Sequence, residues 1–225
     1  MKTLIKVVVL FITTVTFAQN SIEKTIGEFN ELKVYDLINV ELIKSDIDKV
    51  TITGKNKKDV LVNNKSGTLK IKMNLGEAFD GNKTKVKLYY TNIDVIDANE
   101  GAKIHSDDII KQFEIDLNAQ EGSKINVKLD VKYANIRSVT GADIIASGIA
   151  INQDISIYTG GDYNGKTLKT ELTEVSIRAA GEAHIYATKK VEAKVRAGGD
   201  IYIYGNPERV DESRVLGGRI KRINE

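Results

Sequence analysis

Hydrophobic and polar residues alternate in short runs along most of this chain. The segments Ile155–Tyr158 and Ile201–Tyr204 both carry isoleucine at every second position, and glycines lie close to each segment. A period of two is typical of β-strands that bury one face. A helix would need apolar positions three and four residues apart, and a glycine in every repeat would weaken it. The pattern therefore predicts an all-β protein with negligible helix.

A four-residue phrase recurs from Ala98 to Arg222. It consists of Gly or Ala, a small residue, a charged residue and, in nearly every copy, an aliphatic residue. The copies begin at residues 101, 122, 141, 160, 180, 198 and 217, so the spacing lies between 18 and 21 residues. Repeats of this length indicate a solenoid or an array. Because β-branched runs flank the glycines and the fixed leucines of a leucine-rich repeat are absent, we predict a parallel β-helix (β-solenoid) with about 19–20 residues per coil.

The phrase also predicts which side chains fill the interior. Coils of a parallel β-helix stack about 4.8 Å apart, so equivalent positions form columns. Two apolar columns lie five and three residues before each phrase, and a third is the fourth position of the phrase itself. The third column contains Ile104, Ile125, Ile144, Tyr163, Ala183, Ile201 and Ile220.

The beginning of the chain predicts export. Lys2 and Lys6 precede the apolar run Val7–Phe17, and the small residues Thr16 and Ala18 suit a cleavage site before Gln19. Residues 1–18 are therefore predicted to be a signal peptide, because the apolar run is too short for a membrane span. The alternative is an uncleaved, buried β-strand. We expect an exported protein with no transmembrane segment after cleavage, located in the periplasm, on the outer-membrane surface or outside the cell.

Residues 19–225 are predicted to form a single β-solenoid domain. The strands of residues 21–97 are less regular than the coils of residues 98–222. The first part is either a set of irregular first coils or a small covering sheet. We favour first coils, because no linker rich in proline or serine separates the two parts.

Composition excludes several classes of function. The absence of cysteine excludes disulfides and thiolate metal sites. Removing Lys2 and Lys6 with the signal peptide lowers the count of Lys and Arg from 33 to 31, which equals the 31 Asp and Glu. A chain of balanced charge is not expected to bind nucleic acid. We predict no cofactor.

Several segments resemble a known family. They are Phe29–Val34, Lys49–Gly54, Leu69–Ile71 and the recurring Gly-x-Asp-Ile phrase. Together they resemble the putative auto-transporter adhesin, head GIN domain family, over about residues 26 to 222. The resemblance implies a right-handed β-helix that is exported by Bacteroidetes-like bacteria. It implies no established activity and provides no functional residue to carry over.

The third position of the phrase is a candidate ion site. In the middle coils it holds Asp143, Asp162, Glu182 and Asp200, which would form one outward line of carboxylates. Such a line could bind Ca²⁺ through carboxylate oxygens, or it could simply be a solvated edge. Carboxylate pairs also act in polysaccharide lyases and hydrolases. The coils are too short and uniform for the long loops of a catalytic groove, so we predict no enzyme and no catalytic residue.

Four aromatic side chains are the candidate binding site. His184, Tyr186, Tyr202 and Tyr204 fall on two late coils and would form a two-by-two outward patch, called the aromatic patch below. It could bind sugars or a protein, or it could only stabilise the sheet through cross-strand stacking. The other histidine, His105, lies four coils from His184, so the two cannot share a metal ion.

A basic strip is expected on another face. Arg178 and Arg196 stack beneath Tyr158 and are flanked by Arg137 and Lys194. The strip could solvate the sheet or bind an anionic glycan.

Taken together, the residues predict an exported, non-enzymatic binding or structural module of the bacterial cell envelope. It would recognise a glycan or a protein, at the cell surface or in the periplasm, through a flat β-helix face. One alternative is a carbohydrate-active enzyme that uses the stacked carboxylates. The other is a homo-oligomer that assembles through the open ends of the solenoid.

Overall fold

A computed structural model describes residues 21–223, and the predicted signal peptide lies outside the described residues. These residues form 17 strands and three short 3-10 helices. In this part of the chain no helix is long and apolar enough to cross a membrane. The strands are β1 (Ile22–Thr25), β2 (Glu31–Val34), β3 (Asn39–Lys44), β4 (Lys49–Gly54), β5 (Val60–Lys65), β6 (Thr68–Met73), β7 (Thr84–Tyr90), β8 (Val95–Ala98), β9 (Lys103–Lys111), β10 (Glu114–Gln120), β11 (Lys124–Val139), β12 (Asp143–Tyr158), β13 (Asp162–Ile177), β14 (Glu182–Val195), β15 (Asp200–Tyr204), β16 (Arg209–Arg214) and β17 (Arg219–Arg222); the 3-10 helices are η1 (Lys57–Asp59), η2 (Leu75–Glu77) and η3 (Gly81–Lys83).

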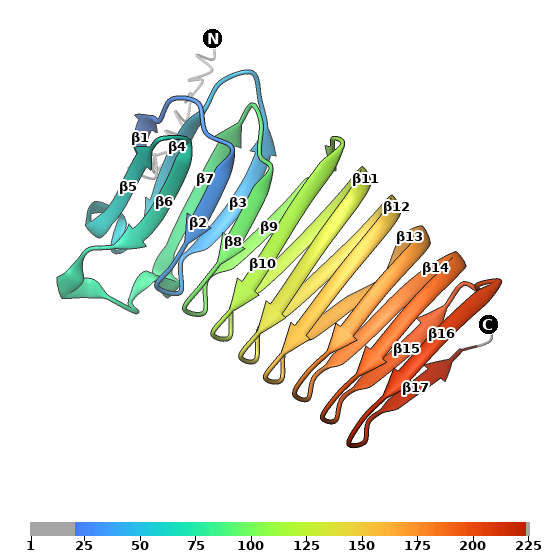
Figure 1. Cartoon of the computed structure of the whole chain (residues 1–225). Coiled ribbons are helices and arrows are strands. Elements are labelled where there is room, and N and C mark those ends of the chain that lie inside the picture. The colour runs from blue at the N-terminus through green and yellow to red at the C-terminus, as the bar shows by residue number, and fades with distance from the viewer. Residues whose placement is uncertain (1–20, 224–225) are drawn as a thin grey trace, which may run out of the picture.

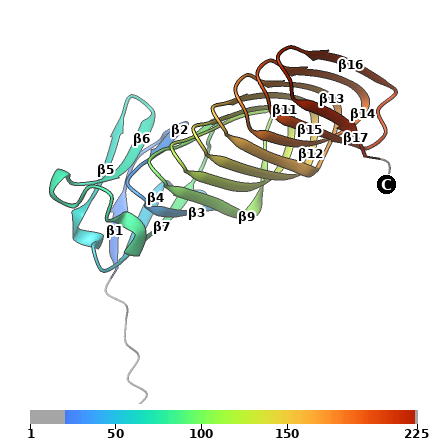
Figure 2. The same ribbon diagram turned by 90° about the horizontal axis from the view of Figure 1, so that it is seen from below.

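The strands stack into a parallel β-solenoid, which confirms the predicted fold (Figure 1). Each coil contributes to two sheets, and the long strands β11 to β14 run through both. Sheet I contains, in spatial order, β5, β6, β2, β8, β10, the second halves of β11 to β14, and β16. Sheet II contains β1, β4, β7, β3, β9, the first halves of β11 to β14, β15 and β17. Figure 2 shows the coils from below as a stack of curved loops.

The predicted inner columns are present. In sheet I, Leu117 pairs with Ile136 and Ile136 with Ile155. In sheet II, Ile125 pairs with Ile144, and Ile144 with Tyr163. All of these side chains are buried, so each coil covers the apolar face of the next and the core runs along the stack.

The two small positions of the phrase have different physical roles. At the bends, two consecutive residues have positive φ, as at Thr140 (52°) and Gly141 (69°), and glycine adopts this conformation most easily. Space is not the reason, because nothing lies within 4 Å of a Cβ built on Gly141. At the second position of the phrase, the lack of space explains why the residue is small. A Cβ on Gly161 would lie 2.5 Å from the Ser138 carbonyl oxygen. The second column is therefore small because neighbouring backbones approach closely.

One inner position is filled in an unusual way. Tyr163 occupies the place that Ile144 fills in the preceding coil and Ala183 in the following coil. Its ring is buried, its hydroxyl hydrogen-bonds with Gln153 Nε2, and burial raises the pKa of this hydroxyl. A Cβ on Gly165 would lie 2.3 Å from Tyr163 Oη. Gly165 thus provides the volume for the tyrosine ring.

The first coils do not stack in sequence order. In sheet I, β2 lies between β6 and β8, and in sheet II, β3 lies between β7 and β9. The coil of β6 and β7 is therefore outside the coil of β2 and β3. Antiparallel strands then close this end, with β5 beside β6, and β4 and β1 beyond β7 (Figure 2). Residues 21–97 thus combine irregular coils with a small antiparallel cover, the two arrangements that the sequence left open.

The last coil ends the solenoid with charged inner positions. Glu212 follows Ala193, Arg214 follows Val195, and Arg222 follows Ile203 in the inner columns. An ion pair joins Arg222 Nη2 to Glu212 Oε1 at 3.7 Å. Inward-pointing charges prevent edge strands from pairing with another chain. This arrangement disfavours the hypothesis of assembly through the C-terminal end.

Candidate functional site

The carboxylates of the repeated phrase lie in one line, as their spacing predicted. Asp143 pairs in register with Asp162, Asp162 with Glu182, and Glu182 with Asp200. At one end of the line, Lys124 Nζ lies 3.2 Å from Asp143 Oδ2. The four carboxylates therefore form a column beside the bends, and its first member is neutralised.

The other end of this column is also neutralised. Arg219 Nε donates to Asp200 Oδ1 at 2.8 Å, and Arg219 Nη2 bonds the second carboxylate oxygen. This bidentate contact lowers the pKa of the Asp200 carboxyl. Such a side chain stays ionised and is already engaged by a cation.

The two middle carboxylates, Asp162 and Glu182, each contact a neighbouring group of the chain. Glu182 N donates to Asp162 Oδ1 at 3.0 Å, and Glu182 Oε1 lies 2.6 Å from His184 Nε2. Partial burial raises the pKa of Asp162, and the charges of Glu182 and Asp143 add to this effect. Among residues 21–223, no group of three or more His, Asp or Glu side chains could hold a metal ion.

The aromatic patch forms, and the structure brings its four side chains together on sheet II. His184 pairs in register with Tyr202, and Tyr186 with Tyr204. The His184 ring stacks on Tyr202 with centroids 4.7 Å apart, and His184 Nδ1 lies 3.1 Å from Tyr204 Oη. Because Nε2 faces Glu182, both nitrogens of the imidazole have partners.

The patch is more closed than the sequence predicted. Tyr204 is only 7% exposed, because neighbouring side chains cover its outward-facing ring. Lys166 Nζ lies 4.5 Å from the Tyr204 ring centroid. Lys166 belongs to the stretch of β13 where the register shifts after Gly165. Tyr186 and Tyr202 remain half-buried, and Lys221 Nζ lies 5.8 Å from the Tyr202 ring. The patch thus offers the exposed parts of two tyrosine rings with cations around them.

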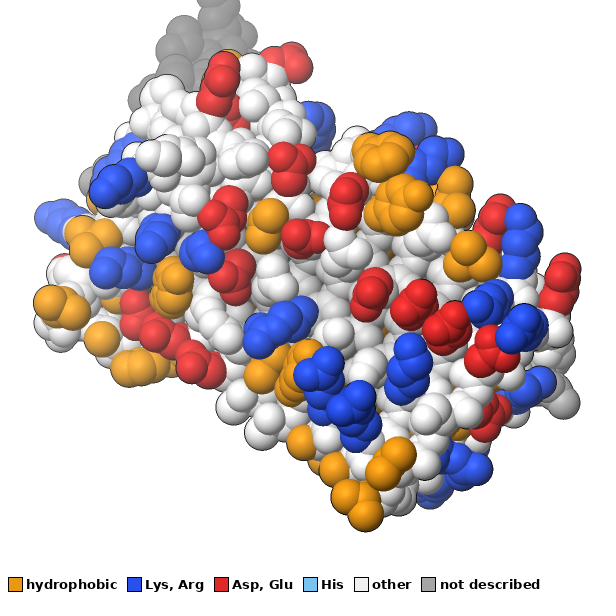
Figure 3. Space-filling model, in the orientation of Figure 1, with side chains coloured by type: hydrophobic (Ala, Val, Ile, Leu, Met, Phe, Trp, Pro, Cys, Tyr) orange, Lys and Arg blue, Asp and Glu red, His pale blue; other side chains and the backbone are white. Residues whose placement is uncertain are grey.

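A second acidic column, which was not predicted from the sequence, lies on the outer surface of sheet I. We call it the acidic ladder. Its residues lie six positions before each copy of the repeated phrase. The apolar columns were found by counting back five and three positions, and counting back six positions would have found this column. Pairs in register connect Asp116, Asn135, Asp154, Glu174, Glu192 and Asp211. Figure 3 shows a row of acidic side chains crossing the coils, with basic side chains beside it.

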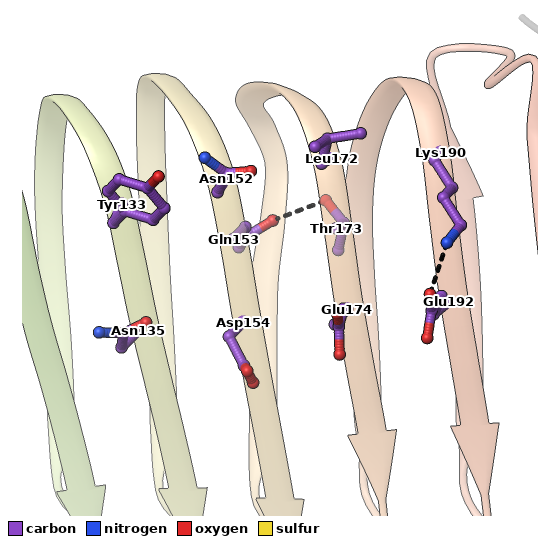
Figure 4. Close-up of a pocket in the computed structure, with 10 residues that line it drawn as sticks. All are labelled: Tyr133, Asn135, Asn152, Gln153, Asp154, Leu172, Thr173, Glu174, Lys190 and Glu192. Carbon is purple, nitrogen blue, oxygen red and sulfur yellow. Dashed lines mark hydrogen bonds and ion pairs between the residues drawn. The ribbon is translucent and has the colours of Figure 1, made fainter.

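A shallow groove of about 330 Å³ follows the acidic ladder across four strands (Figure 4). Asp154 and Glu174 project from adjacent strands at its centre, and Lys190 binds Glu192 at 2.6 Å at one end. This contact lowers the pKa of Glu192. The groove is lined by Tyr133, Asn135, Asn152, Gln153, Asp154, Leu172, Thr173, Glu174, Lys190 and Glu192.

The groove carries an exposed aromatic ring at its other end. Tyr133 is 42% exposed, and its ring centroid lies 5.4 Å from that of Phe113. Asn135 Nδ2 donates to Glu114 Oε1 and to Asp116 Oδ1, both at 2.8 Å. Ring, amide and carboxylate groups therefore occur within one continuous surface.

A second groove, of about 280 Å³, separates the acidic ladder from the predicted basic strip. Ser156 and Ser176 line it between the two charged borders. Arg178 lies 5.0 Å and Arg137 5.7 Å from the Tyr158 ring, so the predicted stacking of Arg178 with this tyrosine is confirmed. Sheet I therefore presents parallel lines of opposite charge along the solenoid.

The chain matches a family model over residues 28–207, that of the putative auto-transporter adhesin, head GIN domain. It belongs to this family. The resemblance found in the sequence is thereby confirmed. No curated protein matches the chain.

Solved structures share the fold of this head GIN domain chain. A putative adhesin from Bacteroides fragilis superposes with a TM-score of 0.84 at 20% identity, covering 91% of this chain and 96% of its own. A putative adhesin from Parabacteroides merdae gives 0.69 at 16% identity, with the same coverage of both chains. A putative lipid binding protein from Parabacteroides distasonis gives 0.67 at 16% identity, again with 91% and 96% coverage. The family and these neighbours are described as adhesins or binding proteins, and none of the three is described as an enzyme.

Proposed function

We propose that this protein is an exported, non-enzymatic binding module of the cell envelope that holds an extended glycan against sheet I. The observation that carries the proposal is the groove along the acidic ladder. It crosses four strands, and every strand contributes polar side chains to it. A repeat of about 4.8 Å between strands offers equivalent contacts to successive units of a polymer.

The chemistry of the groove suits a polyhydroxylated ligand. The carboxyl oxygens of Asp154 and Glu174 can accept hydrogen bonds from hydroxyl groups, whereas Asn152 both donates and accepts. The exposed face of Tyr133 and the apolar Leu172 provide surfaces for the C–H faces of a sugar ring. These groups together support a glycan more directly than the partly closed aromatic patch does.

The shape of the groove supports binding rather than cleavage. Enzyme pockets normally surround most of the substrate, whereas this groove is a shallow surface along flat coils (Figure 4). The carboxylates first considered for catalysis, Asp143, Asp162, Glu182 and Asp200, bond to neighbouring side chains or backbone groups of the chain. A carbohydrate-active enzyme remains the second hypothesis, because Asp154 and Glu174 are adjacent carboxylates of the kind that glycosidases use.

The first test is a glycan array with the mature chain, Gln19–Glu225, read for binding and for released reducing ends. We expect binding without cleavage. The variant Asp154→Asn/Glu174→Gln should lose at least about tenfold in apparent affinity, because two charge-assisted hydrogen bonds are lost. The matched control is Tyr186→Ala/Tyr202→Ala in the aromatic patch, which should bind as the unmodified chain does.

Other outcomes would contradict the proposal in different ways. Binding that is lost only in the patch variant would move the ligand to sheet II. Released reducing ends that disappear in Asp154→Asn/Glu174→Gln would establish the enzyme. An array with no signal would leave a protein partner as the ligand class and overturn the glycan proposal.

A further inference from the structure

The loop between β6 and β7 exposes apolar side chains to an unusual degree. Leu75 is 94% exposed and Phe79 is 61% exposed, and both belong to residues 74–83, which include η2 and η3. Single exposed apolar residues are common on protein surfaces, but two large ones in one short projecting loop mark an interaction site. This loop is at the end of the solenoid closed by antiparallel strands, far from the groove on the middle coils (Figure 1).

The fold holds Phe79 outward at an energetic cost. Its φ is +61°, a conformation that bulky residues rarely adopt. The buried carboxylate of Asp36 fixes this arrangement, since Oδ1 accepts from Phe79 N at 3.2 Å and Oδ2 from Met73 N at 2.9 Å. Asn74 caps η2 by accepting from the backbone N–H of Gly76 at 3.0 Å. The loop is thus braced on both sides, and strain of this kind is typical of functional segments.

Lysines flank the two apolar tips, and the exposed Glu77 lies between the tips in the chain. Lys70 and Lys72 project from β6 and line the same cavity of about 340 Å³ as Leu75 and Phe79. Leu61, 46% exposed, pairs in register with Lys72 on the neighbouring strand. Residues 55–85 contain eight lysines and three carboxylates, although the mature chain as a whole is balanced in charge.

The acidic residues of this region are mostly engaged. Asp59 Oδ1 accepts from Asn74 Nδ2 at 2.9 Å, and Asp80 Oδ2 accepts from Asn56 Nδ2 at 2.7 Å. Glu100, at the edge of the same cavity, has a pKa raised by burial and by the charge of Asp36. The surface that projects to solvent is therefore apolar at its tips, with the exposed Glu77 between them and an excess of lysines in the surrounding segment.

We propose that this loop docks the closed end of the solenoid on an anionic lipid surface. Leu75 and Phe79 would enter the boundary between headgroups and acyl chains, and Lys70 and Lys72 would lie at the level of the headgroup charges. Apolar anchors ringed by lysines are the combination that binds peripheral proteins to anionic bilayers. A lipid surface explains both features, because it accepts isolated apolar tips without a matching pocket and attracts the excess of lysines over carboxylates in residues 55–85. In the docked protein, the groove of sheet I would lie away from the loop that contacts the lipid.

The test is co-sedimentation of the mature chain with vesicles of phosphatidylglycerol and phosphatidylethanolamine, compared with vesicles of phosphatidylcholine alone. We expect binding to the anionic vesicles that weakens as salt is raised. The variant Leu75→Ser/Phe79→Ser should reduce the partition coefficient by roughly tenfold or more, because two apolar anchors are lost. Lys70→Gln/Lys72→Gln should remove most of the dependence on anionic lipid.

Matched controls separate the loop from general surface effects. Ile109→Ser/Ile149→Ser removes two exposed apolar residues from the regular coils, and Lys132→Gln/Lys169→Gln removes two exposed lysines there. Both should bind vesicles as the unmodified chain does. Because the chain has no tryptophan, Phe79→Trp provides a single fluorescent probe. Its emission should shift to the blue with anionic vesicles, whereas that of Ile149→Trp should not.

The proposal is wrong if the chain stays in the supernatant with anionic vesicles, and the loop then becomes a candidate for a protein contact. Equal binding to phosphatidylcholine would remove the role of the lysines. Equal loss in the control variants would remove the role of the loop.

Discussion

Replacing Gly165 by alanine is expected to lower the free energy of unfolding by about 3 kcal/mol or more, the upper part of the range for overpacked cores. The added methyl group would lie 2.3 Å from Tyr163 Oη and 2.6 Å from Tyr163 Cε1. The ring is buried within the solenoid and hydrogen-bonded to Gln153, so it cannot move aside without breaking that bond. Chemical denaturation of the mature chain, followed by circular dichroism, measures the change.

A second substitution tests whether the tyrosine is the cause. In a Tyr163→Ile background the volume above Gly165 is free, so Gly165→Ala should cost less than about 1 kcal/mol. The control is Gly160→Ala at a bend, where φ is +73° and no atom lies near the added Cβ. Its cost comes from backbone strain and should be the same in both backgrounds. Equal costs of Gly165→Ala in the two backgrounds would contradict the steric explanation.

The triple variant Glu212→Val/Arg214→Val/Arg222→Val is expected to associate through the C-terminal end of the solenoid into dimers. These three residues occupy inner columns that are aliphatic in the preceding coil. With valine at all three positions, the last coil would expose an apolar face and two unpaired edge strands, which other copies could cover. Size-exclusion chromatography with light scattering, over a range of protein concentrations, reports the change in mass.

The matched control changes charged residues of the same coil that point outward. Asp211→Val/Arg219→Val/Lys221→Val alters the charge of the last coil but leaves the inner positions charged, and it should remain monomeric. An unmodified chain that already forms end-to-end oligomers would show that the charged inner positions do not close this end. The hypothesis of assembly through the solenoid ends would then regain support.

The regular coils could be predicted from the sequence because their physics is local and repetitive. A fixed bend and a constant distance between coils place residues of equal offset in one column. Counting from each bend therefore located Ile144, Tyr163 and Ala183 in the core and Asp143 beside the bend. The same count applied six positions before each phrase would have found the acidic ladder, an offset that was not examined.

Other features depend on contacts that a count cannot reveal. The position of β2 between β6 and β8 follows from pairing between segments more than thirty residues apart. The burial of Tyr204 involves His184 from the preceding coil and Lys166 from the stretch of β13 where the register shifts. The strained φ of Phe79 depends on Asp36, more than forty residues earlier. Long-range pairing, irregular register and side chain to backbone bonds thus mark the limit of the sequence prediction.

The most direct test of the account is calorimetric titration of the mature chain with oligosaccharides of increasing length, taken from the class that binds on the array. If the ligand lies along the groove, affinity should rise until the oligosaccharide spans the four strands, about 14 Å, and then become constant. Asp154→Asn/Glu174→Gln should weaken the longer ligands most, because they reach both carboxylates. Affinity that does not depend on length, or that is unchanged in this variant, would contradict an extended ligand bound to sheet I.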